Sequence, residues 1–298
     1  MHATTRTRVA LGTAALALAL TACSTAATAP AADRAGDTTA ADPHTTPIRH
    51  VHGLGLDPSD QRLYVASHDG IFTTGEDGAP ERVGDSEDDF MGFAVTGPKT
   101  FLASGHSAPG SGGPGHHGLI ESTDSGRTWK PRSLGGEADF HALEQARGIL
   151  YGYDSTTGLL RVSEDGAAWD DRARLQALDI AVDPDSPGTV LATTPDGVAK
   201  STDGGRTFGS GRQPAMAFLS WPAADALYGL DDFGGLHRST DGGATWKKAG
   251  TVPGGQSQAL TAVDAQHVLA ATQDGVYEST DGGATFARRL PVHAGDGH

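Results

Sequence analysis

The sequence predicts an all-β protein, a six-bladed β-propeller whose blades are four-stranded antiparallel sheets. Three observations lead to this prediction. One octapeptide of the type STDGGxT followed by Trp or Phe recurs along the chain, successive copies lie roughly 40 residues apart, and each copy follows the same series of short apolar segments. A period of about 40 residues is the length of one four-stranded propeller blade.

The octapeptide has four full copies and one shortened copy. They occupy residues 122–129, 201–208, 239–246, 279–286 and, in shortened form, 163–169. The motif resembles the Asp-box, also called the bacterial neuraminidase (BNR) repeat, which forms the turn between the third and fourth strands of a blade. The resemblance implies that five aspartates form turns rather than act as catalytic acids or calcium ligands: Asp124, Asp165, Asp203, Asp241 and Asp281.

The N-terminus has the features of a lipoprotein signal peptide. Arg6 and Arg8 precede an apolar run over residues 9–20 that is too short for a permanent membrane span. The run ends in LTAC, which resembles the bacterial lipobox, in which the cysteine receives a diacylglycerol. We therefore expect residues 1–22 to be removed and Cys23, the only cysteine, to anchor the protein in the extracytoplasmic cell envelope. The alternative is an ordinary signal peptide with an incidental cysteine.

The next segment is expected to be a disordered tether. Residues 23–47 consist mainly of Ala, Thr, Pro and Asp and have almost nothing to bury. The formal net charge of the chain is −15, which argues against nucleic acid or anionic lipid as a partner and is compatible with cations. Attachment to the membrane should therefore depend on the lipid on Cys23 alone.

The propeller itself is predicted over residues 48–291, followed by a flexible tail over residues 292–298. Its six units start near residues 48, 88, 137, 176, 213 and 256. Each unit contains an alternating apolar strand, a turn, a second strand such as LYVAS or VLATT, and a third strand that leads into the box. The first unit retains only TTGEDG as the remnant of its box.

Histidines are expected to gather on one face of the propeller. In this fold the first strand of each blade starts on the face that also carries the loops between second and third strands, and the Asp-box turns lie on the opposite face. This rule places seven of the 13 histidines on the first face: His50, His52, His68, His106, His116, His117 and His141.

The apolar alternation also aligns the first strands of the six blades with one another. The equivalent position is then occupied by His52, Met91, His141, Leu178, Met216 and Ala259. Because side chains in a strand repeat every two residues, equivalent positions point the same way. We expect His52, Met91 and His141 to converge at the mouth of the central channel. The further candidates are His50, His106 and Met216.

Imidazole and thioether together form a soft ligand set that suits copper, above all the cuprous ion. The sequence thus predicts a transition-metal site, with a small polar ligand as a second kind of partner. Three acids expected on the same face add carboxylates, namely Glu137, Asp139 and Asp154, and the long loop over residues 104–119 is expected to act as a lid. The structural alternative is that the methionines fill the core and the histidines bond to backbone carbonyls.

Most of the chain resembles a family of bacterial exported propellers labelled glycosyl hydrolase or exo-sialidase-like. The resemblance rests on HVHGLGLDP, DFMGF, FLASGH, GLIESTDSGRTW, GEADFHAL and LYGYDSTTG. A glycoside hydrolase that uses two of the three acids is therefore an alternative, although a sialidase's arginine triad does not assemble from these residues. A more distant resemblance is to the photosystem II assembly-factor propellers, which implies a third reading, a non-catalytic docking platform for another exported protein.

Overall fold

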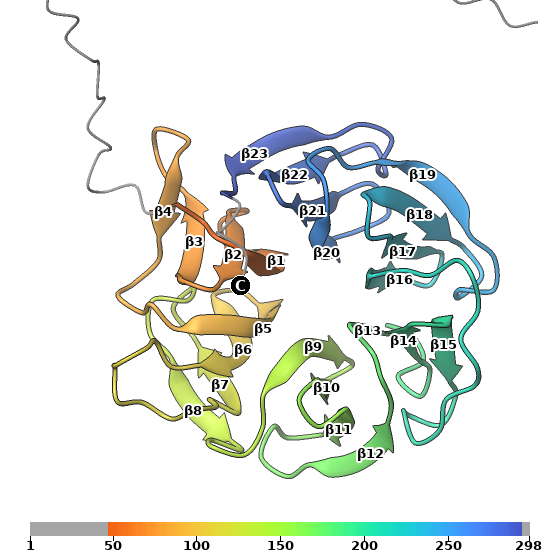
Figure 1. The fold of residues 1–298 in the computed structure, drawn as a ribbon, viewed down its shortest axis with the longest axis horizontal. Coiled ribbons are helices and arrows are strands. Elements are labelled where there is room, and N and C mark those ends of the chain that lie inside the picture. Colours follow the sequence, from red (N-terminus) through yellow and green to blue (C-terminus); the bar gives the residue numbers. More distant parts are fainter. Residues whose placement is uncertain (1–46, 294–298) are drawn as a thin grey trace, which may run out of the picture. The chain divides into compact units, whose positions relative to one another are not determined.

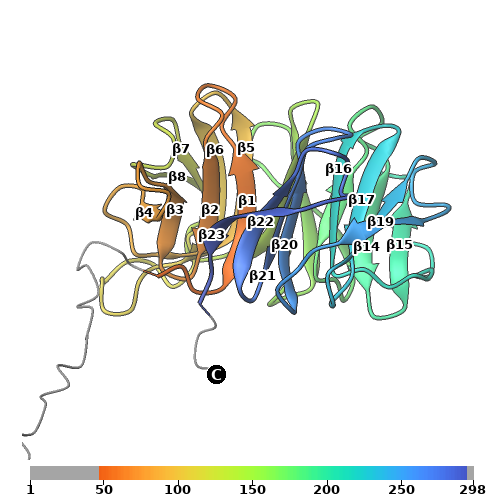
Figure 2. The ribbon, with the colours of Figure 1, turned by 90° about the horizontal axis from the view of Figure 1, so that it is seen from above.

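The computed structural model describes residues 47–293, and these residues form a ring of six β-sheets (Figure 1). The innermost strands of the six sheets line the centre of the ring, and the strands run across its thickness (Figure 2). The predicted six-bladed β-propeller is therefore confirmed. No helix in residues 47–293 is long and apolar enough to cross a membrane.

Each blade is built from strands that follow one another in sequence and pair antiparallel. Blade 1 contains β1 (Val51–Leu56), β2 (Leu63–Ser67), β3 (Gly70–Thr74) and β4 (Pro80–Arg82). Blade 2 contains β5 (Asp89–Gly97), β6 (Thr100–His106), β7 (Leu119–Ser122) and β8 (Lys130–Ser133). Blade 3 contains β9 (Phe140–Ala146), β10 (Ile149–Asp154), β11 (Leu159–Ser163) and β12 (Asp170–Arg174).

The other three blades complete the ring. Blade 4 contains β13 (Ile180–Val182), β14 (Val190–Thr194) and β15 (Gly197–Ser201). Blade 5 contains β16 (Phe218–Ala223), β17 (Ala226–Leu230), β18 (Gly235–Ser239) and β19 (Lys247–Thr251). Blade 6 contains β20 (Ser257–Ala262), β21 (Val268–Thr272), β22 (Gly275–Ser279) and β23 (Ala287–Pro291). In blade 4 the outer strand is reduced to a single bridge between Val198 and Arg212.

The hydrophobic core is divided into six clusters, one between each pair of neighbouring blades. This division follows from the strand geometry, because successive side chains of a strand point to opposite faces of its sheet and each face meets another blade. Between blades 1 and 2, for example, Tyr64 packs edge-on against Phe101 with ring centroids 4.8 Å apart, and both side chains are fully buried.

The Asp-box aspartates form turns, as predicted. In blade 2 the Oδ1 of Asp124 accepts a hydrogen bond from the Thr128 amide at 2.9 Å, and the Ser122 hydroxyl accepts one from the Gly126 amide at 2.8 Å. Gly126 has a φ of 83°, in the region that favours glycine. The same bonds recur in the other full boxes, and in the shortened box Asp165 accepts from two successive amides. These carboxylates are therefore committed to the turns.

The ring closes where the end of blade 6 meets the start of blade 1. The His293 amide donates a hydrogen bond to the Ile48 carbonyl at 2.9 Å, and His293 forms a parallel bridge with Arg49. Val292 and Ile48 are both buried in the cluster between these two blades. Val292 and His293 therefore belong to the ring rather than to the predicted tail. The predicted signal peptide, Cys23, residues 24–46 and the last five residues lie outside the described part of the chain.

Candidate metal centre

The antiparallel strand order places the starts of the innermost strands and the loops between second and third strands on one face of the ring. On blades 1–3 this surface, which we call the histidine face, carries the seven predicted histidines: His50, His52, His68, His106, His116, His117 and His141. Each of the seven has at least one imidazole or carboxylate neighbour on this face. The sorting of histidines by strand order was therefore correct.

The innermost strand of each of the first three blades has a β-bulge at the residue that was predicted to point toward the channel mouth. The pairing of the innermost strand with its neighbour shifts by one residue at His52 in blade 1, at Met91 in blade 2 and at His141 in blade 3. A bulged residue has no partner opposite it, and bulges often redirect a side chain beside a functional site. The predicted equivalence of His52, Met91 and His141 is confirmed.

The same equivalence is wrong for blades 5 and 6. The bulge of blade 6 lies at Gln258 rather than Ala259, and in blade 5 the pairing of Phe218 with Leu230 leaves Ala217, not Met216, at the equivalent position. A slip of one residue turns every side chain to the other face of the sheet. Met216 is accordingly buried in the core between blades 4 and 5 and is not available as a ligand of the histidine face.

Three imidazoles form the first cluster. One ring nitrogen each from His50, His52 and His68 lies within 4.8 Å of the other two, and the ring centroids are 4.5 to 5.1 Å apart. His50 has a φ of 39°, a strained conformation that a residue other than glycine retains only when its surroundings impose it. The His50 and His68 rings are exposed, whereas only 10% of the His52 side chain is accessible.

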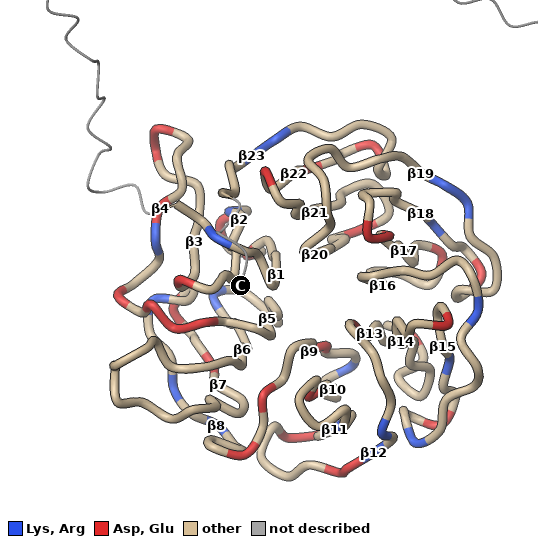
Figure 3. The backbone as a smooth tube through the Cα atoms, viewed as in Figure 1, with Lys and Arg blue, Asp and Glu red and all other residues tan. Residues whose placement is uncertain are grey.

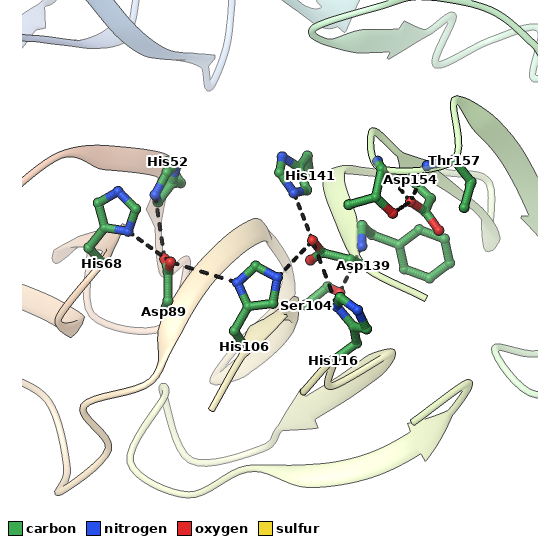
Figure 4. A network of polar contacts seen from close by, with 12 residues as sticks. His52, His68, Asp89, Ser104, His106, His116, Asp139, His141, Asp154 and Thr157 are labelled. Atoms are coloured by element: carbon green, nitrogen blue, oxygen red, sulfur yellow. Dashed lines mark hydrogen bonds and ion pairs between the residues drawn. The ribbon is translucent and has the colours of Figure 1, made fainter. Parts of the chain in front are cut away.

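Asp89, at the start of β5, connects this cluster to the next blade (Figure 4). Its Oδ2 lies 2.8 Å from Nδ1 of His68 and 3.8 Å from Nδ1 of His106, and its Oδ1 lies 3.5 Å from Nε2 of His52. One carboxylate thus contacts His52 on β1, His68 in the β2–β3 loop and His106 at the end of β6.

A second cluster surrounds Asp139, which precedes β9 and is 1% exposed. Its Oδ2 lies 2.9 Å from Nε2 of His106, 2.9 Å from Nε2 of His141 and 4.0 Å from Nδ1 of His116 (Figure 4). The ligand atoms of His106, His116 and Asp139 all lie within 4.8 Å of one another. His106 is therefore shared, with one ring nitrogen near Asp89 and the other near Asp139.

The electrostatics keep His52 neutral and the neighbouring carboxylate of Asp89 ionised. Burial, above all, lowers the pKa of His52 to about 3, and the neighbouring rings of His50 and His68 lower it further against the opposing charge of Asp89. Burial would raise the pKa of Asp89, but the hydrogen bond with His68 and the nearby His52 outweigh it, so that this pKa is lowered. A neutral imidazole beside a carboxylate is the state in which both bind a metal ion.

Several buried polar atoms of this face lack a hydrogen-bond partner. Among the described residues they include His52 Nε2, Asp89 Oδ1, His116 Nδ1, His117 Nε2 and Asp139 Oδ1. Buried polar atoms are nearly always satisfied, because an unpaired one costs about 1–3 kcal/mol. A group of them at one place is what a bound cation would explain.

The other predicted acids do not join the clusters. Glu137 is exposed and contributes to neither of them. Asp154 is fully buried, and its Oδ1 accepts hydrogen bonds from the Thr156 amide and hydroxyl and from the Thr157 amide. Asp154 is therefore chiefly a turn-forming residue at the end of β10.

Two members of the clusters, His68 and His116, and Asp89, which contacts both clusters, were not among the predicted site residues. A signal for Asp89 exists in the sequence, because Asp-Phe precedes the bulged residue in both blade 2 and blade 3. Asp89 and Asp139 hold the same place in their blades as His50 holds in blade 1. For His68 and His116, strand order predicted the face on which they lie but not their distances to the other ligands.

The distribution of charge leaves the centre of the ring free of most cations. The outer strands β8, β12, β19 and β23 each carry two Lys or Arg residues, at the periphery of the ring (Figure 3). Asp89 and Asp139 therefore face the histidines without competing lysines or arginines among their recorded contacts.

Comparison with known proteins supports the repeat and the fold. The model of the BNR/Asp-box repeat matches residues 237–248, so the predicted repeat is present. No curated protein matches the chain as a relative. The GH74 xyloglucanase from Xanthomonas campestris is similar in structure with a TM-score of 0.52 at 18% identity, over 82% of this chain and 46% of the enzyme.

Two further structures are similar to the same extent. An ancestral GH74 enzyme has a TM-score of 0.52 at 15% identity, over 78% of this chain and 36% of that chain. Virginiamycin B lyase from Staphylococcus aureus has a TM-score of 0.56 at 11% identity, over 84% and 85% of the two chains. This chain spans less than half the length of the two GH74 enzymes, and at such identities the likeness concerns the fold alone.

Proposed function

We propose that the protein is a membrane-anchored, extracytoplasmic propeller that binds a transition-metal ion at its histidine face. The ligands of the ion are His50, His52 and His68, and the metal is copper. The observation that carries the proposal is the meeting of three imidazoles within 4.8 Å, one of them with a buried ring nitrogen that has no hydrogen-bond partner.

The geometry of these imidazoles suits an ion after a small adjustment. Two adjacent ligand atoms bound at about 2.0–2.1 Å to a metal ion are roughly 2.9 Å apart in square-planar and roughly 3.3 Å apart in tetrahedral geometry. The nitrogens of His50, His52 and His68 need to approach one another by no more than about 1.5–2 Å to reach that spacing. His50 and His68 are exposed and can make this movement, while buried His52 provides the fixed ligand.

The ligand set favours the cupric rather than the cuprous ion. With Met216 in the core between blades 4 and 5, the cluster offers imidazole nitrogens and, from Asp89, a carboxylate oxygen. Nitrogen and oxygen ligands bind divalent first-row metals in an order that peaks at Cu²⁺. Met91, at the bulge of blade 2, is the one predicted thioether that stays on this face.

The proposed location rests on the N-terminal sequence. The short apolar run and Cys23 in LTAC support export and attachment through a lipid. An exported metal-binding protein would meet metal ions outside the cytoplasm, and the acidic chain, with a net charge of −15, would attract them.

The direct test is titration of Cu²⁺ into the exported protein, followed by calorimetry. His52→Ala and His68→Ala should each weaken binding by at least about 100-fold, because each removes one of three ligands. His237→Ala is the matched control, since His237 lies on β18 of blade 5 and pairs with Asp231. Equal affinity of the wild type and both variants would overturn the proposal.

The glycoside hydrolase alternative has less support. A glycosidase needs a carboxylic acid whose pKa is raised so that it can donate a proton. The pKa of Asp139 is instead lowered, because the hydrogen bond with His141 and the nearby His106 outweigh burial. Glu137 is exposed and Asp154 is committed to its turn. The likeness to GH74 enzymes supports only the fold, so we do not propose this activity.

A docking role for a further exported protein is compatible with metal binding. Phe233, between β17 and β18 of blade 5, is 87% exposed, and Leu178, just before β13 of blade 4, is 54% exposed. Both lie on the same side of the ring as the histidines. Capture of a partner that is lost after Phe233→Ser would support this second role.

A further inference from the structure

We infer that the histidine face holds a second metal ion, bound by His106, His116 and Asp139. This inference rests on the proposed function and adds a site to it. The ligand atoms of these residues lie within 4.8 Å of one another, as in the first cluster. The two clusters are formed by different blades and do not share a residue.

The second site has an ionised carboxylate at its centre. Asp139 is 1% exposed, and its Oδ1 is buried without a hydrogen-bond partner. Nδ1 of His116 is also buried and unpartnered. Buried polar atoms without a partner are costly, and a divalent cation bound beside Asp139 and His116 would satisfy both of these atoms.

A small adjustment would bring these atoms to the spacing of metal ligands. Nε2 of His106 lies 2.9 Å from Oδ2 of Asp139, and Nδ1 of His116 lies 4.0 Å from the same oxygen. These values lie on either side of the roughly 3.3 Å expected for two ligands of a tetrahedral ion. His141, at 2.9 Å from the same oxygen, either orients the carboxylate or supplies a fourth ligand.

The ion would join the two ends of the long loop of blade 2. His106 ends β6 and His116 lies just before β7, and their ring centroids are 5.3 Å apart. The base of the loop is held in advance, because the His117 amide donates to the Gly105 carbonyl and the Gly136 amide donates to the His116 carbonyl, each at 2.8 Å. Metal binding then costs little conformational entropy, because the base of the loop is already ordered.

The two sites are coupled through His106 and Asp89. Nδ1 of His106 is 3.8 Å from Asp89, which also contacts His68 of the first cluster at 2.8 Å. An ion bound at Nε2 of His106 makes the ring a stronger donor at Nδ1 and draws Asp89 toward it. The second ion should therefore change the affinity of the first site by a small factor, about 2- to 5-fold.

Metal content after equilibrium dialysis against Cu²⁺ is the test. The wild-type protein should retain two ions, Asp139→Asn one ion, and His68→Ala one ion. Glu137→Gln is the matched control, because this exposed acid two residues from Asp139 belongs to neither cluster, and it should retain two ions. Because Asp139 is buried, His116→Ala serves as the second variant, and it should also retain one ion.

The outcomes separate this inference from the proposed function. One ion in the wild type, unchanged in Asp139→Asn and His116→Ala but lost in His68→Ala, would overturn the second site and leave the first. No ion in the wild type would overturn both. As an independent readout, Cu²⁺ should slow proteolytic cleavage of residues 107–118 in the wild type but not in His116→Ala; equal protection would also contradict the inference.

Discussion

At the scale of single residues, burial assigns different roles to side chains of the same type. His52 is kept neutral by burial and offers a free nitrogen, whereas the hydrogen bond with Asp89 raises the pKa of exposed His68. Met91 lies at a bulge of the histidine face, whereas Met216 is 5% exposed between two blades. Residue type alone therefore does not identify the ligands.

Replacing Met216 by alanine tests this distinction. Met216→Ala should lower the free energy of unfolding by about 2–4 kcal/mol, because it leaves a cavity among packed side chains such as Trp221 and Trp246. It should leave Cu²⁺ affinity unchanged, since the thioether is not a ligand. Denaturant unfolding and calorimetry measure the two quantities, and a loss of affinity in the folded variant would restore Met216 to the site.

Glu144 on β9 offers a prediction of pH dependence away from the metal ligands. Burial, and then the charge of Asp179, raises the pKa of Glu144 from 4.5 to about 8. Asp179 is fixed nearby, with Oδ2 accepting the Leu219 amide at 2.8 Å. The folded protein thus binds a proton that the unfolded chain releases, so stability should fall as the pH rises from about 4.5 to about 8.

Glu144→Gln removes this titration while keeping the shape of the side chain. At pH 9 the variant should be more stable than the wild type by roughly 1–3 kcal/mol, and at pH 4 the two should be equal. Thermal unfolding across this range is the measurement. A variant that is less stable at pH 9 would show that the carboxylate is stabilised rather than penalised in the folded state.

At the scale of elements, the turns hold neighbouring blades together. Asp57, in the turn between β1 and β2, is fully buried and accepts hydrogen bonds from the Ser59 amide, the Lys99 amide and the Ser125 hydroxyl. Ser125 belongs to the Asp-box of blade 2. One carboxylate of blade 1 is thus bonded to two turns of blade 2.

Asp57→Ala should destabilise the protein by about 2–4 kcal/mol at neutral pH, because three donors lose a buried ionised acceptor. Burial would raise the pKa of Asp57, but these hydrogen bonds lower it below 3.8. The stabilisation is therefore present above pH 3.8 and is lost as the pH falls through the lower, folded pKa. Acid unfolding checks this: the gap between wild type and variant should shrink at low pH, and a constant gap would contradict the account.

The strands also show which parts of the fold could be predicted from the sequence. The box repeat fixed the number of blades and the opposite faces of boxes and histidines, because both follow from period and strand order. Alternation failed in blades 5 and 6, where Ala217 and Gln258 take the places assigned to Met216 and Ala259. A bulge adds one residue to one strand only, and the apolar pattern of that strand does not report it.

Contacts between blades were a further limit. Asp89, His68 and His106 lie in three separate loops or strands. No local sequence spacing encodes the distances of 2.8 and 3.8 Å from the Asp89 carboxylate to the imidazoles of His68 and His106. The sequence could place these residues on one face, but the packing of blades 1–3 determines which atoms meet. The proposed metal site could thus be predicted as a region and not as a ligand set.

At the scale of the whole molecule, six contiguous blades are closed by a short seam. The seam consists of the hydrogen bond from His293 to Ile48, the burial of Val292, and the Val51 amide donating to the Gln258 side chain at 2.9 Å. Each blade is local in sequence, so this junction is the place where the first and last parts of the chain must meet.

Deletion of residues 292–298 tests the seam. It removes the buried Val292 side chain and two backbone hydrogen bonds, from the Val292 amide to the Asp274 carbonyl and from the His293 amide to the Ile48 carbonyl. It should lower the free energy of unfolding by about 1–3 kcal/mol. That loss corresponds to a melting temperature lower by roughly 3–10 °C for a domain of this size. Deletion of residues 294–298 alone is the control. An unchanged melting temperature in the longer deletion would mean that the seam does not stabilise the ring.

We propose that blades 1–3 together build a metal centre at the histidine face. Anomalous diffraction at the copper edge, from crystals of the protein equilibrated with Cu²⁺, locates any bound copper. We expect one peak among His50, His52 and His68 and a second beside His106, His116 and Asp139. A map with no peak at the first cluster, or with copper bound only elsewhere on the ring, would contradict it.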